Sequence, residues 1–153
     1  MPYIESSIIV PGSVQQAYEL AKNMERYPEF MTNVQQVVVV EREMDKTVTQ
    51  WVTQVDGRTI KWVEQDIFFA AEPRIEYKLL SGDLKKFEGE WRFESMEEGT
   101  SITLTVDFEF GIPMIAGLLN PILKQKTKAN CLAMLEGIRS QLLRSEEADS
   151  EVS

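Results

Sequence analysis

The hydrophobic pattern of the sequence changes its period once, near residue 113, and this change restricts the fold more than any other feature. Before that point, apolar and polar residues alternate in short runs, as in Ile102–Phe110, which is typical of antiparallel strands with one face in water. From Pro113 to Leu143, apolar residues recur at helical spacing, and Pro121 predicts a kink in a helix that begins near Met114. The apolar stripe consists of Leu118, Ile122, Ala129, Leu132, Leu135, Ile138 and Leu142. We therefore expect an α+β fold, with seven strands in an antiparallel sheet and a C-terminal helix long enough to cross that sheet.

Two short helices are expected between the first and second strands. Tyr3–Val10 alternates as a first strand. Ser13 followed by Gln16 forms a capping-box signature, which predicts the start of the first helix. Arg26–Met31 predicts a second short helix or turn, because Pro28 is suited to a first helical position.

An Asp-Gly pair at residues 56–57 predicts a two-residue hairpin turn of type I′, because both central residues of that turn need positive φ. A turn of this length fixes the register of its two strands and pairs Trp51 with Trp62. The face that carries the two tryptophans is the more apolar one. We therefore expect it to point toward the core.

The tryptophan face also carries polar residues, which are Thr49, Thr53, Arg58, Glu64 and Asp66. This is too polar for a dry core. An inward carboxylate needs a partner, which Arg58 could supply as a structural ion pair. The alternative is an acid-base role for Glu64. A bulge in this strand would instead turn both acids outward.

The next two strands are expected to continue the same inner face. A three-residue turn at Ser81–Asp83 would place Tyr77 opposite Phe87. Both rings then lie on the side of the sheet that carries the tryptophans.

Composition excludes several classes of site. The chain has no histidine and one cysteine, so neither a Cys/His metal cage nor a histidine-dependent nucleophile is expected, and we predict no metal and no cofactor. The net charge of −9 opposes attraction to nucleic acid or to anionic membranes. No stretch approaches 18 apolar residues, so we expect no membrane insertion and a cytoplasmic location. The charge and composition leave the oligomeric state open.

The length of 153 residues favours one domain. No repeat or linker divides the chain before its acidic end. We expect one domain over residues 1–144 and a disordered acidic tail over residues 145–153.

Three segments carry a resemblance to a known superfamily. They are Glu25–Phe30, the pattern Phe87-x-Gly89-x-Trp91-x-Phe93, and Val106-x-Phe108-x-Phe110-Gly111-x-Pro113. In this order, they resemble the START/Bet v 1-like (SRPBCC) superfamily, in its polyketide cyclase/dehydrase and coenzyme Q-binding branch, over about residues 3–143. The resemblance implies a helix-grip fold, in which a seven-stranded curved antiparallel sheet is wrapped around the long C-terminal helix. It also implies a lipid, quinone or polycyclic ligand between sheet and helix.

A bent sheet cannot contact a straight helix everywhere, so an apolar gap with a few polar groups is expected independently of the resemblance. The candidate ligand-binding residues are Phe30, Met31, Trp51, Trp62, Tyr77, Phe87, Trp91, Phe108, Met114, Leu118 and Ile122. Phe30 and Met31 are expected near the mouth of the gap. A carrier or sequestering protein for a hydrophobic small molecule is the leading interpretation.

Two other functions remain open. A polyketide cyclase or dehydratase would need donors and a base, for which Glu64, Arg58 and Tyr77 are the inward candidates. The related cyclases place an arginine a few residues beyond the position of Trp51, where this chain has none. A protein-interaction module is the third function, since some bacterial relatives are linked to ribosomes. Lys124, Lys126 and Lys128 form a basic patch that is most simply a solvated helix face.

Overall fold

A computed structural model describes the backbone of residues 3–55, 58–110 and 113–152, and the side chains of residues 3–54, 59–109 and 124–145. The elements follow the order expected from the sequence. They are β1 (Tyr3–Val10), α1 (Val14–Lys22), the 3₁₀ helix η1 (Met24–Glu29), β2 (Val34–Arg42), β3 (Lys46–Val55), β4 (Arg58–Phe69), β5 (Arg74–Gly82), β6 (Leu84–Met96), β7 (Gly99–Phe110) and α2 (Pro113–Val152). The predicted capping box is present, since Ser13 and Gln16 each accept the other's backbone N–H.

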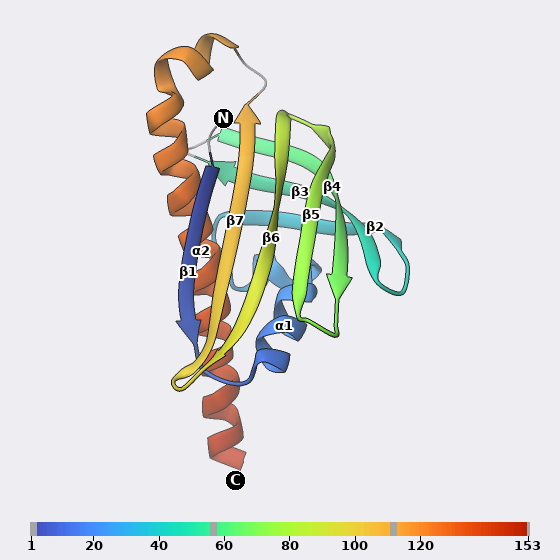
Figure 1. Ribbon diagram of the computed structural model, residues 1–153, viewed down its shortest axis with the longest axis vertical. Helices are drawn as coiled ribbons and strands as arrows, with labels where there is room; N and C mark the ends of the chain where they lie inside the picture. The colour runs from blue at the N-terminus through green and yellow to red at the C-terminus, as the bar shows by residue number, and fades with distance from the viewer. Residues whose placement is uncertain (1–2, 56–57, 111–112, 153) are drawn as a thin grey trace.

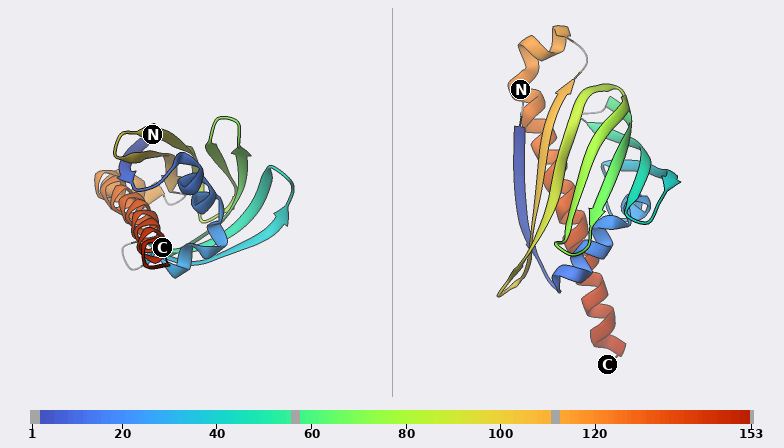
Figure 2. Two further views of the ribbon diagram at one scale, coloured as in Figure 1. Left: turned by 90° about the horizontal axis from the view of Figure 1, so that it is seen from below. Right: turned by 45° about the vertical axis from the view of Figure 1, so that its right-hand side comes forward.

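The strands form one antiparallel seven-stranded sheet in the order β1-β7-β6-β5-β4-β3-β2. The sheet curls around one side of the molecule, and α2 runs along the open side, where it packs mainly on β1 (Figures 1 and 2). This is the α+β helix-grip arrangement that the sequence predicts, with two short helices after β1.

The predicted register of β3 and β4 is confirmed. Trp51 pairs with Trp62 and Thr49 with Glu64 along a ladder that runs without a register shift. The turn itself, at residues 56–57, lies outside the described residues. Because β4 keeps its alternation, Glu64 and Asp66 both lie on the inner face, where both are buried.

A bulge does occur next to these acids, but on the neighbouring strand. Val63 pairs with Ser81 whereas Glu64 pairs with Leu79, so Leu80 of β5 is the extra residue. Leu80 is exposed. Because the extra residue lies on β5, the bulge does not change the inward orientation of Glu64 on β4.

The predicted pairing of Tyr77 with Phe87 is wrong by two residues, because Tyr77 pairs with Gly89. The segment around residue 83 binds β4 instead of closing a tight turn, since Asp83 exchanges two hydrogen bonds of 2.8 Å with the backbone of Lys61. Gly82 makes this possible: its φ is +135°, and a Cβ there would lie 2.5 Å from the Cα of Trp62. A shift of two residues keeps every side chain on its predicted face.

Helix α2 begins at Pro113 and continues past Leu143 to Val152, so the predicted C-terminal end was too early. Its first turns lie at an angle to the rest, and its last turns project beyond the sheet (Figure 1). A formed helix extends at low cost through good helix formers such as Arg144, Glu146, Glu147 and Ala148. The assignment of residues 145–153 to a separate acidic tail stays a prediction.

The buried stripe of α2 differs in phase from the predicted one. Leu135, Ile138 and Leu142 are buried as expected, but Ala129 and Leu132 face solvent. Cys131 takes the inward position instead. When a helix carries apolar residues on several sides, the sequence does not specify which side is buried. In α2, packing against the sheet decides it.

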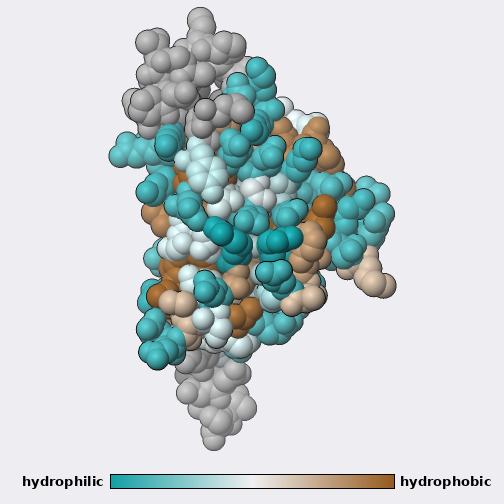
Figure 3. Space-filling model, in the orientation of Figure 1, coloured by the Kyte–Doolittle hydropathy of each residue, from teal (hydrophilic) through white to brown (hydrophobic). Residues whose placement is uncertain are grey.

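The outer face of the sheet, turned toward the viewer in Figure 3, is mostly hydrophilic. It carries ion pairs between strands, such as Lys86–Asp107 at 2.9 Å from β6 to β7 and Arg92–Glu5 at 2.7 Å, which reaches across β7 from β6 to β1. Within the described residues, no helix is both long and apolar enough to cross a membrane.

Candidate functional site

A small hollow lies inside the curve of the sheet, beneath α2. Its volume is about 50 Å³, and its described walls are almost wholly apolar. The lining residues are Trp51, Trp62, Glu64, Tyr77, Phe87, Trp91, Leu104, Val106, Cys131 and Met134. All three tryptophans of the chain are among them.

The aromatic rings of the hollow form a continuous cluster. Trp51 and Trp62 stack with ring centroids 5.5 Å apart and an angle of 7° between their planes. Phe87 packs against Trp62 at 4.9 Å and against Tyr77 at 5.2 Å. Tyr27 of η1 meets the edge of Trp51 at 5.6 Å. The register of the β3–β4 hairpin therefore creates one wall of the site. Tyr27 of η1 packs against this wall.

The structure brings five of the predicted ligand-binding residues to the hollow: Trp51, Trp62, Tyr77, Phe87 and Trp91. Phe108 is buried in the core but is not among the described lining residues. The side chains of Met114, Leu118, Ile122 and Arg58 lie outside the described residues.

Phe30 and Met31 pack further along α2 than expected. A Cβ on Gly137 would lie 2.6 Å from the carbonyl oxygen of Phe30 and 2.9 Å from Cγ of Met31. Gly137 follows Met134 by about one turn and Cys131 by more than one, so this contact lies C-terminal to the hollow. Phe30 and Met31 thus fix η1 against the helix, and neither is a described lining residue.

The sequence analysis missed four lining residues, which are Leu104, Val106, Cys131 and Met134. The alternation of β7 places Leu104 and Val106 on the inner face, so that signal was available. The sequence contains no such signal for Cys131 and Met134, because their position depends on which side of α2 faces the sheet.

Two buried carboxyl groups lie side by side at the polar edge of the cluster. Glu64 accepts a hydrogen bond of 2.7 Å from Nε1 of Trp62. Oδ2 of Asp66 accepts hydrogen bonds from the hydroxyls of Thr49 (2.6 Å) and Thr47 (3.2 Å). The two carboxyl groups are electrostatically linked, since each contributes to the pKa of the other. A hydrogen bond between them requires a proton on one of the two groups.

The electrostatics assign that proton to Glu64. Burial raises the pKa of Glu64 well above its usual range, and the neighbouring Asp66 raises it further. Burial also raises the pKa of Asp66, but the hydrogen bonds from Glu64, Thr49 and Thr47 oppose this by stabilising its charge. We therefore treat the pair as a neutral Glu64 beside a charged Asp66.

The ion pair predicted with Arg58 cannot be located, because the Arg58 side chain lies outside the described residues. None of the ion pairs in the described part of the chain includes Glu64 or Asp66. Among the described residues, the donors to these acids are the hydroxyls of Thr47 and Thr49 and the indole N–H of Trp62.

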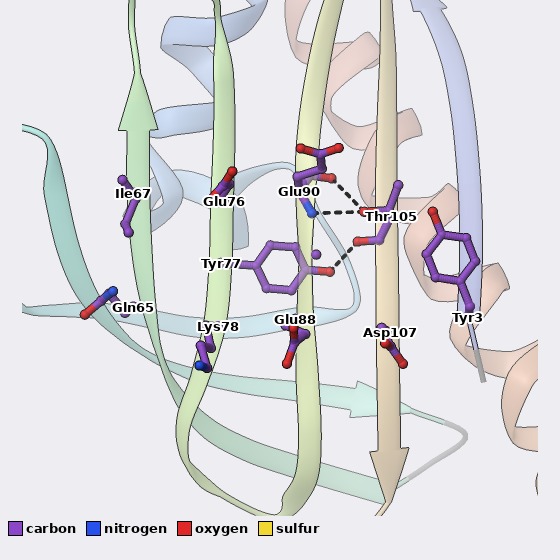
Figure 4. Close-up of a pocket in the computed structure, with 11 residues that line it drawn as sticks. Tyr3, Gln65, Ile67, Glu76, Tyr77, Lys78, Glu88, Glu90, Thr105 and Asp107 are labelled. Atoms are coloured by element: carbon purple, nitrogen blue, oxygen red, sulfur yellow. Dashed lines mark hydrogen bonds between the residues drawn. The ribbon is translucent and has the colours of Figure 1, made fainter. Parts of the chain in front are cut away.

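Tyr77 joins the hollow to the opposite face of the sheet. Its hydroxyl donates a hydrogen bond of 2.6 Å to the carbonyl oxygen of Thr105 across β6, at Gly89 (Figure 4). A Cβ on Gly89 would meet that carbonyl and lie 2.8 Å from the tyrosine hydroxyl. Glycine at this position thus leaves room for Tyr77 to cross the strand.

A larger groove, of about 390 Å³, lies on the outer side of the same strands (Figure 4). Its walls include four carboxylate residues, which are Glu76, Glu88, Glu90 and Asp107. Several of these are already paired with cations of the sheet, as in Lys86–Asp107. A shallow groove of this charge is less suited to an apolar ligand than the inner hollow.

Cys131 provides no nucleophile, because burial raises the pKa of its thiol to about 12. Burial likewise raises the pKa of Tyr77 well above its usual range, so its hydroxyl stays neutral. Among the described residues, no group of three or more Cys, Asp or Glu side chains is placed to hold a metal ion. The chemistry available in the hollow is therefore apolar contact with a hydrogen-bonding carboxyl group.

Comparison with known proteins gives a consistent result. A family model described as "Polyketide cyclase / dehydrase and lipid transport" matches residues 10–135. The chain is 24% identical to the ribosome association toxin RatA of Pseudomonas aeruginosa over 80% of its own length and 85% of that protein.

Two solved structures illustrate the shared fold. TTHA0849 from Thermus thermophilus has a TM-score of 0.90 at 28% identity, with 94% of this chain and 99% of that chain covered. The Zhui aromatase/cyclase from Streptomyces sp. R1128 has a TM-score of 0.83 at 19% identity, with 93% of each chain covered. At 19% identity, the likeness to Zhui is one of fold alone.

Proposed function

The chain belongs to the polyketide cyclase / dehydrase and lipid transport family, and from this premise we propose that it binds a hydrophobic small molecule between its sheet and α2. The observation that carries the proposal is the apolar inner hollow, walled by all three tryptophans, Tyr77 and Phe87. Aromatic walls with a small number of polar groups are typical of ligand sites. We further propose that the protein acts as a carrier or sequestering protein.

The volume of the hollow sets a condition on binding. Sites for drug-sized ligands usually measure about 300–1,000 Å³, whereas this hollow measures about 50 Å³. A ligand must therefore enlarge it. Phe87 and Met134 are half-buried, and flexible methionine side chains adapt readily to apolar ligands. We expect these two side chains to move when a ligand enters.

Filling the hollow should abolish ligand binding. Val106 is buried in its wall, and a Val106→Phe change would occupy the space that a ligand needs. With the neutral fluorophore N-phenyl-1-naphthylamine, we expect saturable quenching of tryptophan emission in the wild-type protein and at least tenfold weaker binding in V106F. Fluorescence titration measures both dissociation constants.

The matched control is Val38→Phe, which makes the same change at a half-exposed position of β2. It should bind the fluorophore as the wild-type protein does. Equal binding by V106F and the wild-type protein would place the ligand elsewhere and overturn the proposal.

A second candidate function is association with the ribosome, which the printed name of the relative RatA favours. The net charge of −9 opposes direct contact with RNA phosphates, so basic ribosomal proteins would be the contact. On this reading, the purified protein sediments with ribosomes through a sucrose gradient at low salt and dissociates as salt rises. Failure to co-sediment at low salt would remove this candidate and leave ligand binding unaffected.

A further inference from the structure

Glu64 differs from every other described residue that lines the hollow, because it is the one carboxyl group among them. It is 3% exposed and lies between the rings of the aromatic cluster and Asp66. A buried carboxyl at an apolar wall is costly unless it is neutral or well paired. Its presence at this wall therefore calls for a role.

Asp66 explains how Glu64 is held. One oxygen of Asp66, Oδ2, accepts from the hydroxyls of Thr49 and Thr47. The other, Oδ1, is buried and has no N–H or hydroxyl donor among the described residues. A protonated Glu64 can supply the missing donor, because it lies two residues before Asp66 on the same buried face of β4.

Hydrogen bonds connect the carboxyl pair, Glu64 and Asp66, to both stacked tryptophans. Nε1 of Trp51 donates to the hydroxyl of Thr49 at 2.8 Å, and that hydroxyl donates to Asp66. Nε1 of Trp62 donates to Oε1 of Glu64. The stacked rings and the carboxyl pair are thus one rigid unit, with Glu64 at its edge toward the hollow.

We propose that Glu64 is the specificity-determining residue of the site, where its neutral carboxyl donates a hydrogen bond to a carbonyl oxygen of an apolar ligand. This inference rests on the proposed function and adds the chemical class of the ligand. When the proton turns toward a ligand, Asp66 keeps two hydroxyl donors for its charge. A ligand carboxylate would instead be repelled by Asp66, and a pure hydrocarbon would leave the donor unused.

The other titratable groups near Glu64 do not compete for this role. Tyr27 from η1, Tyr77 from β5 and Cys131 from α2 are all buried, and burial raises the pKa of each. All three stay neutral at physiological pH. The hydroxyls of Tyr27 and Tyr77 already donate to backbone carbonyls, so Glu64 is the donor that a ligand in the hollow would meet.

Two bicyclic probes that differ by one carbonyl group test the inference. We expect the wild-type protein at pH 6 to bind 1-tetralone at least tenfold more tightly than tetralin, measured by displacement of N-phenyl-1-naphthylamine. In Glu64→Met, which removes the donor but keeps the length of the side chain, the preference should disappear. Glu64→Gln should keep a preference, because its amide N–H can also donate.

A pH series separates proton donation from a merely structural role. Raising the pH until Glu64 ionises should abolish the preference for tetralone in the wild-type protein and leave that of Glu64→Gln unchanged. This comparison also holds if Glu64→Met does not fold. Two results would overturn the inference without affecting the proposal of ligand binding. One is the same ratio of tetralin to 1-tetralone dissociation constants in the wild-type protein and Glu64→Met, and the other is a wild-type ratio that does not change with pH. If neither probe binds the wild-type protein, the proposed function fails as well.

Discussion

Replacing Trp51 by alanine is expected to lower the free energy of unfolding by about 3–5 kcal/mol, the usual cost of removing a large buried aromatic side chain. Trp51 is 3% exposed, stacks on Trp62 and makes a T-shaped contact with Tyr27. Its indole N–H also donates to Thr49, which in turn supports Asp66. The substitution therefore opens a cavity and loosens the carboxyl pair together. Urea denaturation of the two proteins measures the difference.

Trp51→Phe is the matched control, because it keeps an aromatic ring and removes the indole N–H. Trp51→Phe should lower the free energy of unfolding by clearly less than Trp51→Ala does. A loss below about 1 kcal/mol for Trp51→Ala would mean that the stacked pair does not organise the core, and it would contradict the packing described above.

The stability of the protein should fall as the pH rises above about 4.5, the ordinary pKa of a glutamate. Because the pKa of Glu64 is raised in the folded state, the folded protein keeps a proton that the unfolded chain releases. Unfolding then becomes more favourable with each pH unit, by about 1.4 kcal/mol for this one group. The slope ends where Glu64 ionises in the folded protein.

Glu64→Gln isolates this contribution, since its amide is neutral at every pH and can donate to Asp66. The difference in unfolding free energy between Glu64→Gln and the wild-type protein should be constant below pH 4.5 and increase above it in favour of the variant. Urea denaturation at a series of pH values measures it. A difference that stays flat between pH 5 and pH 8 would show that Glu64 is ionised in the folded protein at neutral pH.

The aromatic wall of the site could be predicted because a local signal controls it. Residues 56–57 specify a two-residue turn, and the register that follows places Trp51 against Trp62 and turns Glu64 and Asp66 inward. The alternation of β5 and β6 likewise predicts the inner position of Tyr77, although the register is wrong by two residues. The face of the sheet on which a side chain lies depends on local alternation. The pairing register of two strands also depends on contacts that the turn between them makes with other strands.

The other wall could not be predicted, because it depends on packing between distant segments. Cys131 and Met134 reach the hollow only through the phase of α2 against the sheet. The hydroxyl donors of Asp66, in contrast, follow from the predicted register, since Thr47 pairs with Asp66 and Thr49 with Glu64. These hydroxyls are an alternative to the ion pair with Arg58 that the sequence analysis considers.

Native mass spectrometry after incubation with a bacterial lipid extract measures whether the inner hollow takes up a ligand. We expect the wild-type chain of 17.6 kDa to retain one small apolar molecule per protein, V106F to retain none, and V38F to behave as the wild-type protein does. A wild-type protein that retains nothing, or a V106F variant that retains the same molecule to the same extent, would show that the hollow is not a ligand site.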